Sequence, residues 1–146
     1  MTNCNQLPIF LQSEIELLTP QDAKHLWEET IAYAHHADDE VTARFVTEIE
    51  SKKLNKEYRK KDKATNVLTF SYGEGTHDIA LCLPVAEREA SERQVGLREY
   101  VALLLVHAFL HAVGFDHERS EEEAKATSVA EQEILARAGF ATAHLE

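Results

Sequence analysis

The sequence predicts an α+β domain in which helices pack against a small mixed β-sheet of about four strands. Short runs rich in β-branched residues alternate with longer segments whose apolar residues recur at helical spacing. Two of the strand-like runs are separated by the turn-forming residues 73–76, which favour a returning strand. With 146 residues, 44% of them hydrophobic, the chain is long enough to bury a substantial core, and we expect a single domain over 1–146.

The first part of the chain predicts a strand, a helix and a second strand. Residues 7–11 are apolar enough for a short strand. Thr19 can cap a helix that has Pro20 at its first position, and apolar residues then recur at helical spacing to about His36. Residues 41–49 are rich in β-branched side chains, which predicts a strand over the whole run.

A short helix and a hairpin are expected next. Ser51 is the residue that we expect to cap the helix. The hairpin consists of strands over 65–72 and 78–83, on either side of the turn.

The last third of the chain is predicted to be helical. Pro84 favours the start of a short helix that runs to Ala90, and 97–113 forms the most apolar helix of the chain. Ser120 and the glutamates that follow it resemble a capping box for a final helix, which Gly139 would end.

Charge is distributed unevenly along the chain. The net charge of −11 argues against indiscriminate binding to polyanions, but seven of the fifteen basic residues lie within 52–63. A basic patch on an acidic protein suits local contact with phosphates. The alternative is that these residues form an ordinary solvated helix face.

No feature of the sequence indicates a membrane or an oxidising compartment. No apolar run approaches the roughly 20 residues of a membrane span, and the N-terminus does not resemble a signal peptide. Cys4 and Cys82 are too few for a disulfide framework, and Cys82 is expected to be a buried thiol. We therefore expect a cytoplasmic protein.

Three histidines near the C-terminus form the strongest candidate site. His107 and His111 are four residues apart on the apolar helix, so their Cβ atoms lie about 5–6 Å apart on one face. Gly114 can adopt the left-handed conformation that turns the chain back and brings His117 towards the same point. Three neutral imidazoles leave one tetrahedral position for water, which is typical of catalytic zinc.

An ordinary packed histidine is the alternative for each of these residues, but their spacing favours a metal. An unpartnered imidazole would be costly in so apolar a helix, and the zinc proteases with the motif H-E-x-x-H-x-x-G-x-x-H use the same spacing. Those proteases carry a glutamate as general base after the first histidine, where this chain has Ala108. We therefore expect a zincin-like metal helix whose chemistry is directed at phosphodiesters, to which arginine and lysine are suited.

Residues 107–117 (H-A-F-L-H-A-V-G-F-D-H) resemble the H-G-x-L-H-L-x-G-Y-D-H motif of the YbeY family. Residues 55–70 are similar to that family's N-x-x-Y-R-x-x-D-x-P-T-[DN]-V-L-S-F, and the resemblance continues to about residue 140. This chain departs from the pattern at Ala108, where the family has glycine, at Ala64, at His77 and in a shorter loop over 71–77. The last three departures concern backbone shape around the hairpin, and none of the four changes a histidine of the motif.

The resemblance implies a zinc-dependent endoribonuclease, specific for single strands, that acts in ribosomal RNA maturation at the 3′ end of 16S rRNA and in ribosome quality control. It implies that His107, His111 and His117 bind one Zn²⁺ and that Arg59 holds or polarises a phosphate. The implied partners are single-stranded RNA, rRNA and the ribosome or its small subunit, with no membrane.

Two other functions remain open, a zinc-dependent protease or amidase and a non-catalytic rRNA-binding zinc module. Asp116 could orient a metal ligand or cap the backbone after the helix. No residue in the sequence stands out as the general base.

Overall fold

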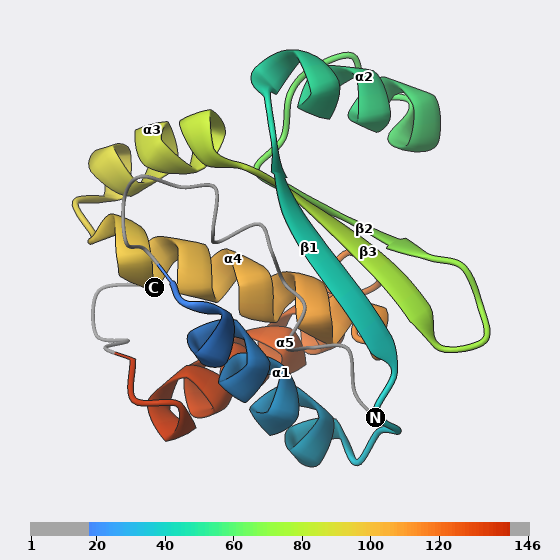
Figure 1. The fold of residues 1–146 in the computed structure, drawn as a ribbon, viewed down its shortest axis with the longest axis vertical. Coiled ribbons are helices and arrows are strands. Elements are labelled where there is room, and N and C mark those ends of the chain that lie inside the picture. The colour runs from blue at the N-terminus through green and yellow to red at the C-terminus, as the bar shows by residue number, and fades with distance from the viewer. Residues whose placement is uncertain (1–17, 141–146) are drawn as a thin grey trace.

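A three-stranded mixed sheet forms the centre of the fold. A computed structural model describes residues 18–140, which form five helices and three strands (Figure 1). In chain order they are α1 (Pro20–Ala34), β1 (Glu40–Val46), α2 (Glu48–Arg59), β2 (Val67–Ser71), β3 (Thr76–Cys82), α3 (Leu83–Arg93), α4 (Leu97–Ala112) and α5 (Glu121–Arg137).

The strand order is β1-β3-β2, with β1 parallel and β2 antiparallel to β3. The α+β class and the mixed sheet are therefore confirmed. About four strands were expected, and residues 18–140 contain three. The strand predicted at 7–11 lies outside the described residues. Within the described residues β2 pairs only with β3, so it forms one edge of the sheet.

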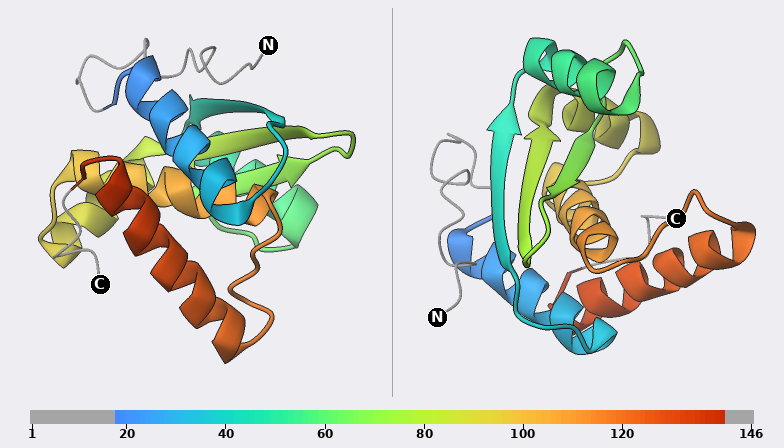
Figure 2. Two further views of the ribbon diagram at one scale, coloured as in Figure 1. Left: turned by 90° about the horizontal axis from the view of Figure 1, so that it is seen from below. Right: turned by 90° about the vertical axis from the view of Figure 1, so that its right-hand side faces the viewer.

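Helix α4 is the central helix of the domain. It contacts β2 and β3 on one side and α1, α3 and α5 on the others (Figures 1 and 2). Between Tyr100 and Leu110 every residue is buried except His107, which is partly exposed. Phe109 packs edge to face against Trp27 of α1, with ring centroids 5.0 Å apart. The apolar helix predicted at 97–113 is therefore confirmed. Within its buried stretch between Tyr100 and Leu110, His107 is the residue that is partly exposed to solvent.

The boundary between β1 and α2 differs from the prediction. The strand expected over 41–49 ends at Val46, and Thr47, not Ser51, caps α2 by accepting a hydrogen bond from the Glu50 amide at 3.1 Å. Ser51 is buried inside the helix, and its hydroxyl bonds both the carbonyl and the amide of Thr65, at 2.8 and 2.9 Å. A β-branched run cannot show where a strand gives way to a cap, because threonine suits both positions.

The other predicted elements are confirmed with small shifts at their ends. Helix α3 extends from Leu83 to Arg93, beyond the predicted end at Ala90. Ser120 caps α5 by accepting from the Glu123 amide, and Gly139 follows the helix with a φ of 87°.

The hairpin between β2 and β3 is tied to the loop before β1 by a chain of side chains. His77 is buried and bonds Ser71 and Asp39, both at 2.8 Å. Gly75, with a φ of +76°, lies so close to Asp39 that a Cβ would be 2.9 Å from its carboxylate. His77 therefore has a packing role in the hairpin.

Cys82 is a free, buried thiol, as expected, and desolvation raises its pKa. Among residues 18–140 no single helix is long and apolar enough to cross a membrane. Helices α3 and α4 reach the required length and composition only as a pair, and they are bent by 117°.

Candidate functional site

The largest hollow described is a cleft of about 910 Å³ that follows the edge strand β2 and the neighbouring face of α4. Arg59, His107, His111 and His117 all line it. The structure therefore brings together four side chains that are up to 58 positions apart in the chain.

Local geometry brings the three histidines to one part of the cleft. His107 and His111 lie one turn apart on α4, and Gly114 then reverses the chain with a φ of 109°. As a result the rings of His107 and His117 meet edge to face, with centroids 4.6 Å apart. In this arrangement the rings touch each other, and within residues 18–140 no three His, Cys, Asp or Glu side chains already form a cluster that could hold a metal ion.

Glu131 of α5 orients His107. Its Oε2 lies 2.5 Å from His107 Nδ1, and only 13% of the Glu131 side chain is exposed. Because a carboxylate accepts hydrogen bonds, Nδ1 carries the hydrogen, which leaves the lone pair on Nε2. Histidines that bind metals through one nitrogen commonly donate the other to a carboxylate in this way.

Sequence reasoning missed Glu131. It lies in an acidic helix among glutamates that look equivalent in sequence, and nothing local distinguishes it from Glu133, which pairs with Arg137 at the surface. Only the packing of α5 against α4 identifies it.

Electrostatics favour a neutral His111. Desolvation within the cleft lowers the pKa of His111. Asp116 acts in the opposite direction, and the neighbouring His107, Arg59 and His117 side chains lower the pKa of His111 further. Neutral imidazole is the form that binds metals.

Asp116 caps the turn after α4. Its Oδ1 accepts a hydrogen bond from the Glu118 amide at 3.0 Å, and its Oδ2 lies 3.8 Å from Arg119 Nε. The capping alternative is therefore the one observed, and its influence on a histidine is electrostatic.

Arg59 lies at the end of α2 and forms an ion pair with Glu118. One guanidinium nitrogen donates to both carboxylate oxygens at 3.0 Å, and this contact lowers the pKa of Glu118. The two side chains are 40% and 52% exposed, so the pair contributes little to stability. An anion entering the cleft can therefore take the place of Glu118.

The sequence left open whether the basic segment 52–63 contacts phosphates or forms an ordinary solvated helix face. In the structure some of its basic residues line the cleft and the others lie outside it. Arg59, Lys61 and Lys63 line the cleft, and the other basic residues of the segment do not. The buried Asn55 donates to the Lys63 carbonyl at 2.9 Å, which holds the loop after α2 in place.

A polar network joins two residues that line the cleft, Asn66 and Tyr100, through Glu89. Glu89 Oε1 accepts hydrogen bonds from Tyr100 at 2.7 Å and from Asn66 at 2.9 Å. Burial, followed by the contact with Glu89, raises the pKa of Tyr100 to about 12. The Arg93 guanidinium lies 5.1 Å from the centroid of the Tyr100 ring.

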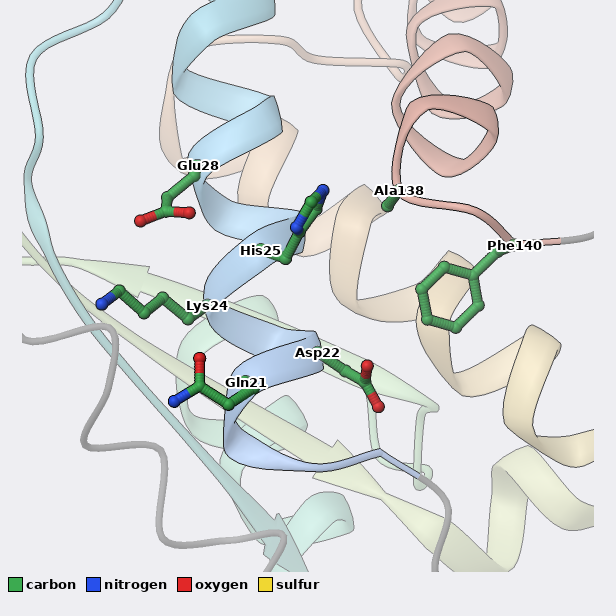
Figure 3. A pocket seen from close by; sticks show the side chains of 7 residues that line it. All are labelled: Gln21, Asp22, Lys24, His25, Glu28, Ala138 and Phe140. Atoms are coloured by element: carbon green, nitrogen blue, oxygen red, sulfur yellow. The ribbon is translucent and has the colours of Figure 1, made fainter.

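A second hollow, of about 300 Å³, lies between α1 and the end of α5 and shares no residue with the cleft (Figure 3). Figure 3 shows Lys24 and Glu28 pointing away from Phe140, whereas His25 and Asp22 lie on the side of α1 nearer to it. The titratable side chains that line this hollow therefore do not all point towards one spot.

Comparison with known proteins gives one consistent result. The family model described as Endoribonuclease YbeY matches residues 10–139. Proteins named Endoribonuclease YbeY from Delftia acidovorans and Paraburkholderia phytofirmans are 49% and 50% identical to this chain, over 114 and 115 residues. Those matches cover 76% and 75% of this chain, and 75% and 74% of the two proteins.

A solved structure agrees with the fold. The solution structure of TM1509 from Thermotoga maritima has a TM-score of 0.56 and 25% sequence identity. The match covers 80% of this chain and 83% of that one.

Proposed function

The chain belongs to the YbeY family of endoribonucleases, and we propose that it cleaves single-stranded RNA with one zinc ion held by His107, His111 and His117. The observation that carries the proposal is the common cleft, which places three imidazoles and the Arg59 guanidinium around one space.

The donor set suits zinc. His107, His111 and His117 would supply three imidazole nitrogens, a donor set typical of catalytic zinc. His111 and His117 are exposed at the surface, so their side chains can change rotamer, while Glu131 holds His107 in place. When bound, the metal would supply an activated water and would polarise a phosphoryl oxygen.

Arg59 binds the scissile phosphate in this proposal. The planar guanidinium can pair with two phosphate oxygens, and here one of its nitrogens already contacts both oxygens of Glu118. The entering phosphate displaces Glu118, and Arg59 then stabilises the charge that develops on the phosphoryl group. Lys61 and Lys63 extend the positive lining of the cleft along the RNA backbone.

We further propose that the natural RNA is ribosomal, that the ribosome or its small subunit delivers it, and that cleavage takes place in the cytoplasm at the 3′ end of 16S rRNA. The family relationship supports this proposal, and the acidic character of the remaining chain suits a nuclease that does not bind every RNA.

The test combines elemental analysis with RNA cleavage by the purified protein. We expect about one zinc per chain and cleavage of a single-stranded RNA but not of its duplex. His111→Ala should lose both metal and cleavage, whereas the matched control His25→Ala, outside the cleft, should lose neither. Cleavage that survives in His111→Ala would contradict the proposal.

Arg59→Glu tests the phosphate contact separately. It should retain zinc and lose about a hundredfold or more in cleavage rate, as expected for removal of a group that stabilises developing charge. Lys52→Glu makes the same charge change in the same helix outside the cleft and should have little effect.

A metal-dependent peptidase is the second candidate, because an exposed edge strand such as β2 can pair with an extended peptide alongside the histidines. Ala108 provides no general base at the position where zinc proteases have one. Peptide cleavage without RNA cleavage would favour this candidate.

A further inference from the structure

Two exposed tyrosines lie in the cleft. Among residues 18–140 the large hydrophobic side chains with the greatest exposure are Ile49 at 83%, Tyr72 at 64%, Tyr58 at 63% and Val129 at 53%. The two aromatic residues line the cleft and the two aliphatic residues do not. The exposed aromatic surface therefore coincides with the candidate active site.

Neighbouring side chains lie against both rings. Tyr58 of α2 packs edge to face with Phe70 of β2, with ring centroids 4.9 Å apart. Tyr72, just after β2, has the Asp78 carboxylate of β3 close to its hydroxyl. Tyr58 is thus held along one edge, and more than half of each tyrosine stays open to solvent.

Positive charge accompanies these rings. Tyr58 directly precedes Arg59 in the chain, and Lys61 and Lys63 follow in the loop that lines the same cleft. Aromatic rings for bases beside cations for phosphates are the combination that binds single-stranded nucleic acid. An extended peptide would have less use for so many cations.

We propose that Tyr58 and Tyr72 form a stacking platform for unpaired bases, and that this platform is what selects single-stranded RNA. In a duplex each base is already stacked and paired, so its faces are not available to a side chain. An unpaired base can lie on a tyrosine while its phosphates contact the basic side chains. This inference rests on the proposed function and names its means of substrate selection.

The test uses metal-free protein in the presence of a chelator, so that RNA is bound without being cleaved. The probes are a ten-nucleotide single-stranded RNA carrying 2-aminopurine, an abasic oligonucleotide of equal length and charge, and the duplex of the first. The variants are Tyr58→Ala and Tyr72→Ala, with Tyr58→Phe and Tyr72→Phe keeping the rings. Ile49→Ala is the matched control for an exposed apolar side chain outside the cleft.

We expect 2-aminopurine fluorescence to be quenched on binding. Each alanine variant should bind the base-containing strand about tenfold more weakly, since stacking contributes on that order per base. Both phenylalanine variants and Ile49→Ala should bind like the unaltered protein. Affinity for the abasic strand should stay the same in all variants, which also shows that they are folded.

Three results would overturn the inference. If the alanine variants bind the base-containing strand like the unaltered protein, the tyrosines do not stack on bases. If they lose affinity for the abasic strand equally, the tyrosines support the fold or the phosphate contacts. If the unaltered protein binds none of the oligonucleotides, either metal-free or loaded with zinc, the proposed function fails as well.

Discussion

Replacing Glu131 with glutamine should weaken metal binding without unfolding the protein. The carboxylate accepts from His107 Nδ1 at 2.5 Å in a largely buried position, which makes the hydrogen bond charge-assisted. Loss of such a partner typically costs about 10–100-fold in metal affinity. Because glutamine keeps an acceptor oxygen, we expect about tenfold for Glu131→Gln, or roughly 1.4 kcal/mol, and closer to a hundredfold for Glu131→Ala.

Two measurements check this expectation. Zinc affinity is obtained by competition with a chelating dye, and the tautomer of His107 is obtained from the ¹⁵N shifts of its ring nitrogens in the metal-free protein. The hydrogen should lie on Nδ1 in the unaltered protein, whereas Glu131→Ala should show a mixture of tautomers. Glu133→Gln is the matched control, because Glu133 lies on the same helix and pairs with Arg137 at the surface.

The reasoning would be refuted by unchanged zinc affinity in both Glu131 variants. If RNA cleavage fell while zinc affinity and the His107 tautomer stayed the same, Glu131 would act on the reaction itself. That result would identify it as a candidate for the general base that the sequence did not reveal.

Three further predictions concern the fold around the cleft. Chelation should abolish RNA cleavage while circular dichroism stays unchanged, because the proposed ligands are close in the chain and the core packs without them; loss of secondary structure would instead indicate structural zinc. Gly75→Ala should destabilise the protein by about 1–3 kcal/mol in urea unfolding, since it adds a clash with Asp39 to the strain of a positive φ. Gly73→Ala introduces the backbone strain without a clash and should destabilise the protein less. Equal losses of stability in the two variants would show that the clash with Asp39 does not contribute. The pKa of Tyr100 is raised from 10.0 to about 12, so the folded state holds this proton more tightly, and the resulting stability is complete below about pH 10 and lost as the pH rises towards 12. Tyr100→Phe should lower the free energy of unfolding by about 1–2 kcal/mol at pH 7, because the hydrogen bond to Glu89 is lost. It should also reduce the fall of the unfolding free energy between about pH 9 and 11.5. If the unfolding free energy fell with pH as steeply as in the unaltered protein, this assignment would be contradicted.

The sequence predicted most helices and strands because their signals are local. The apolar periodicity of 97–113, the Thr19-Pro20 start of α1 and the glycine-containing hairpin turn all lie within a few residues of the structures that they specify. The start of α2 was placed wrongly because Thr47, which caps it, lies in a β-branched run that also suits a strand, and because the role of Ser51 is not local. Ser51 looks like a cap in sequence, but it bonds the backbone of Thr65, fourteen positions away.

The candidate site also combines features that follow from local sequence with features that depend on packing between distant segments. The spacing of His107, His111 and His117 is set by one helix and one turn, so the sequence alone predicted that they would face the same part of the molecule. All three line the cleft, and the rings of His107 and His117 are in contact. The resemblance to a known family implied that Arg59 acts together with the histidines. The position of Arg59 in the cleft depends on how α2 packs beside the edge strand β2.

Only the tertiary structure decided which acidic side chains serve the cleft. Glu131 contacts His107 because α5 crosses α4 at that point, and Glu118 contacts Arg59 because the turn after α4 reaches the end of α2. Neighbouring glutamates have the same local sequence signals and point elsewhere. Helix periodicity identifies the residues that share a face, but only packing between elements determines what that face meets.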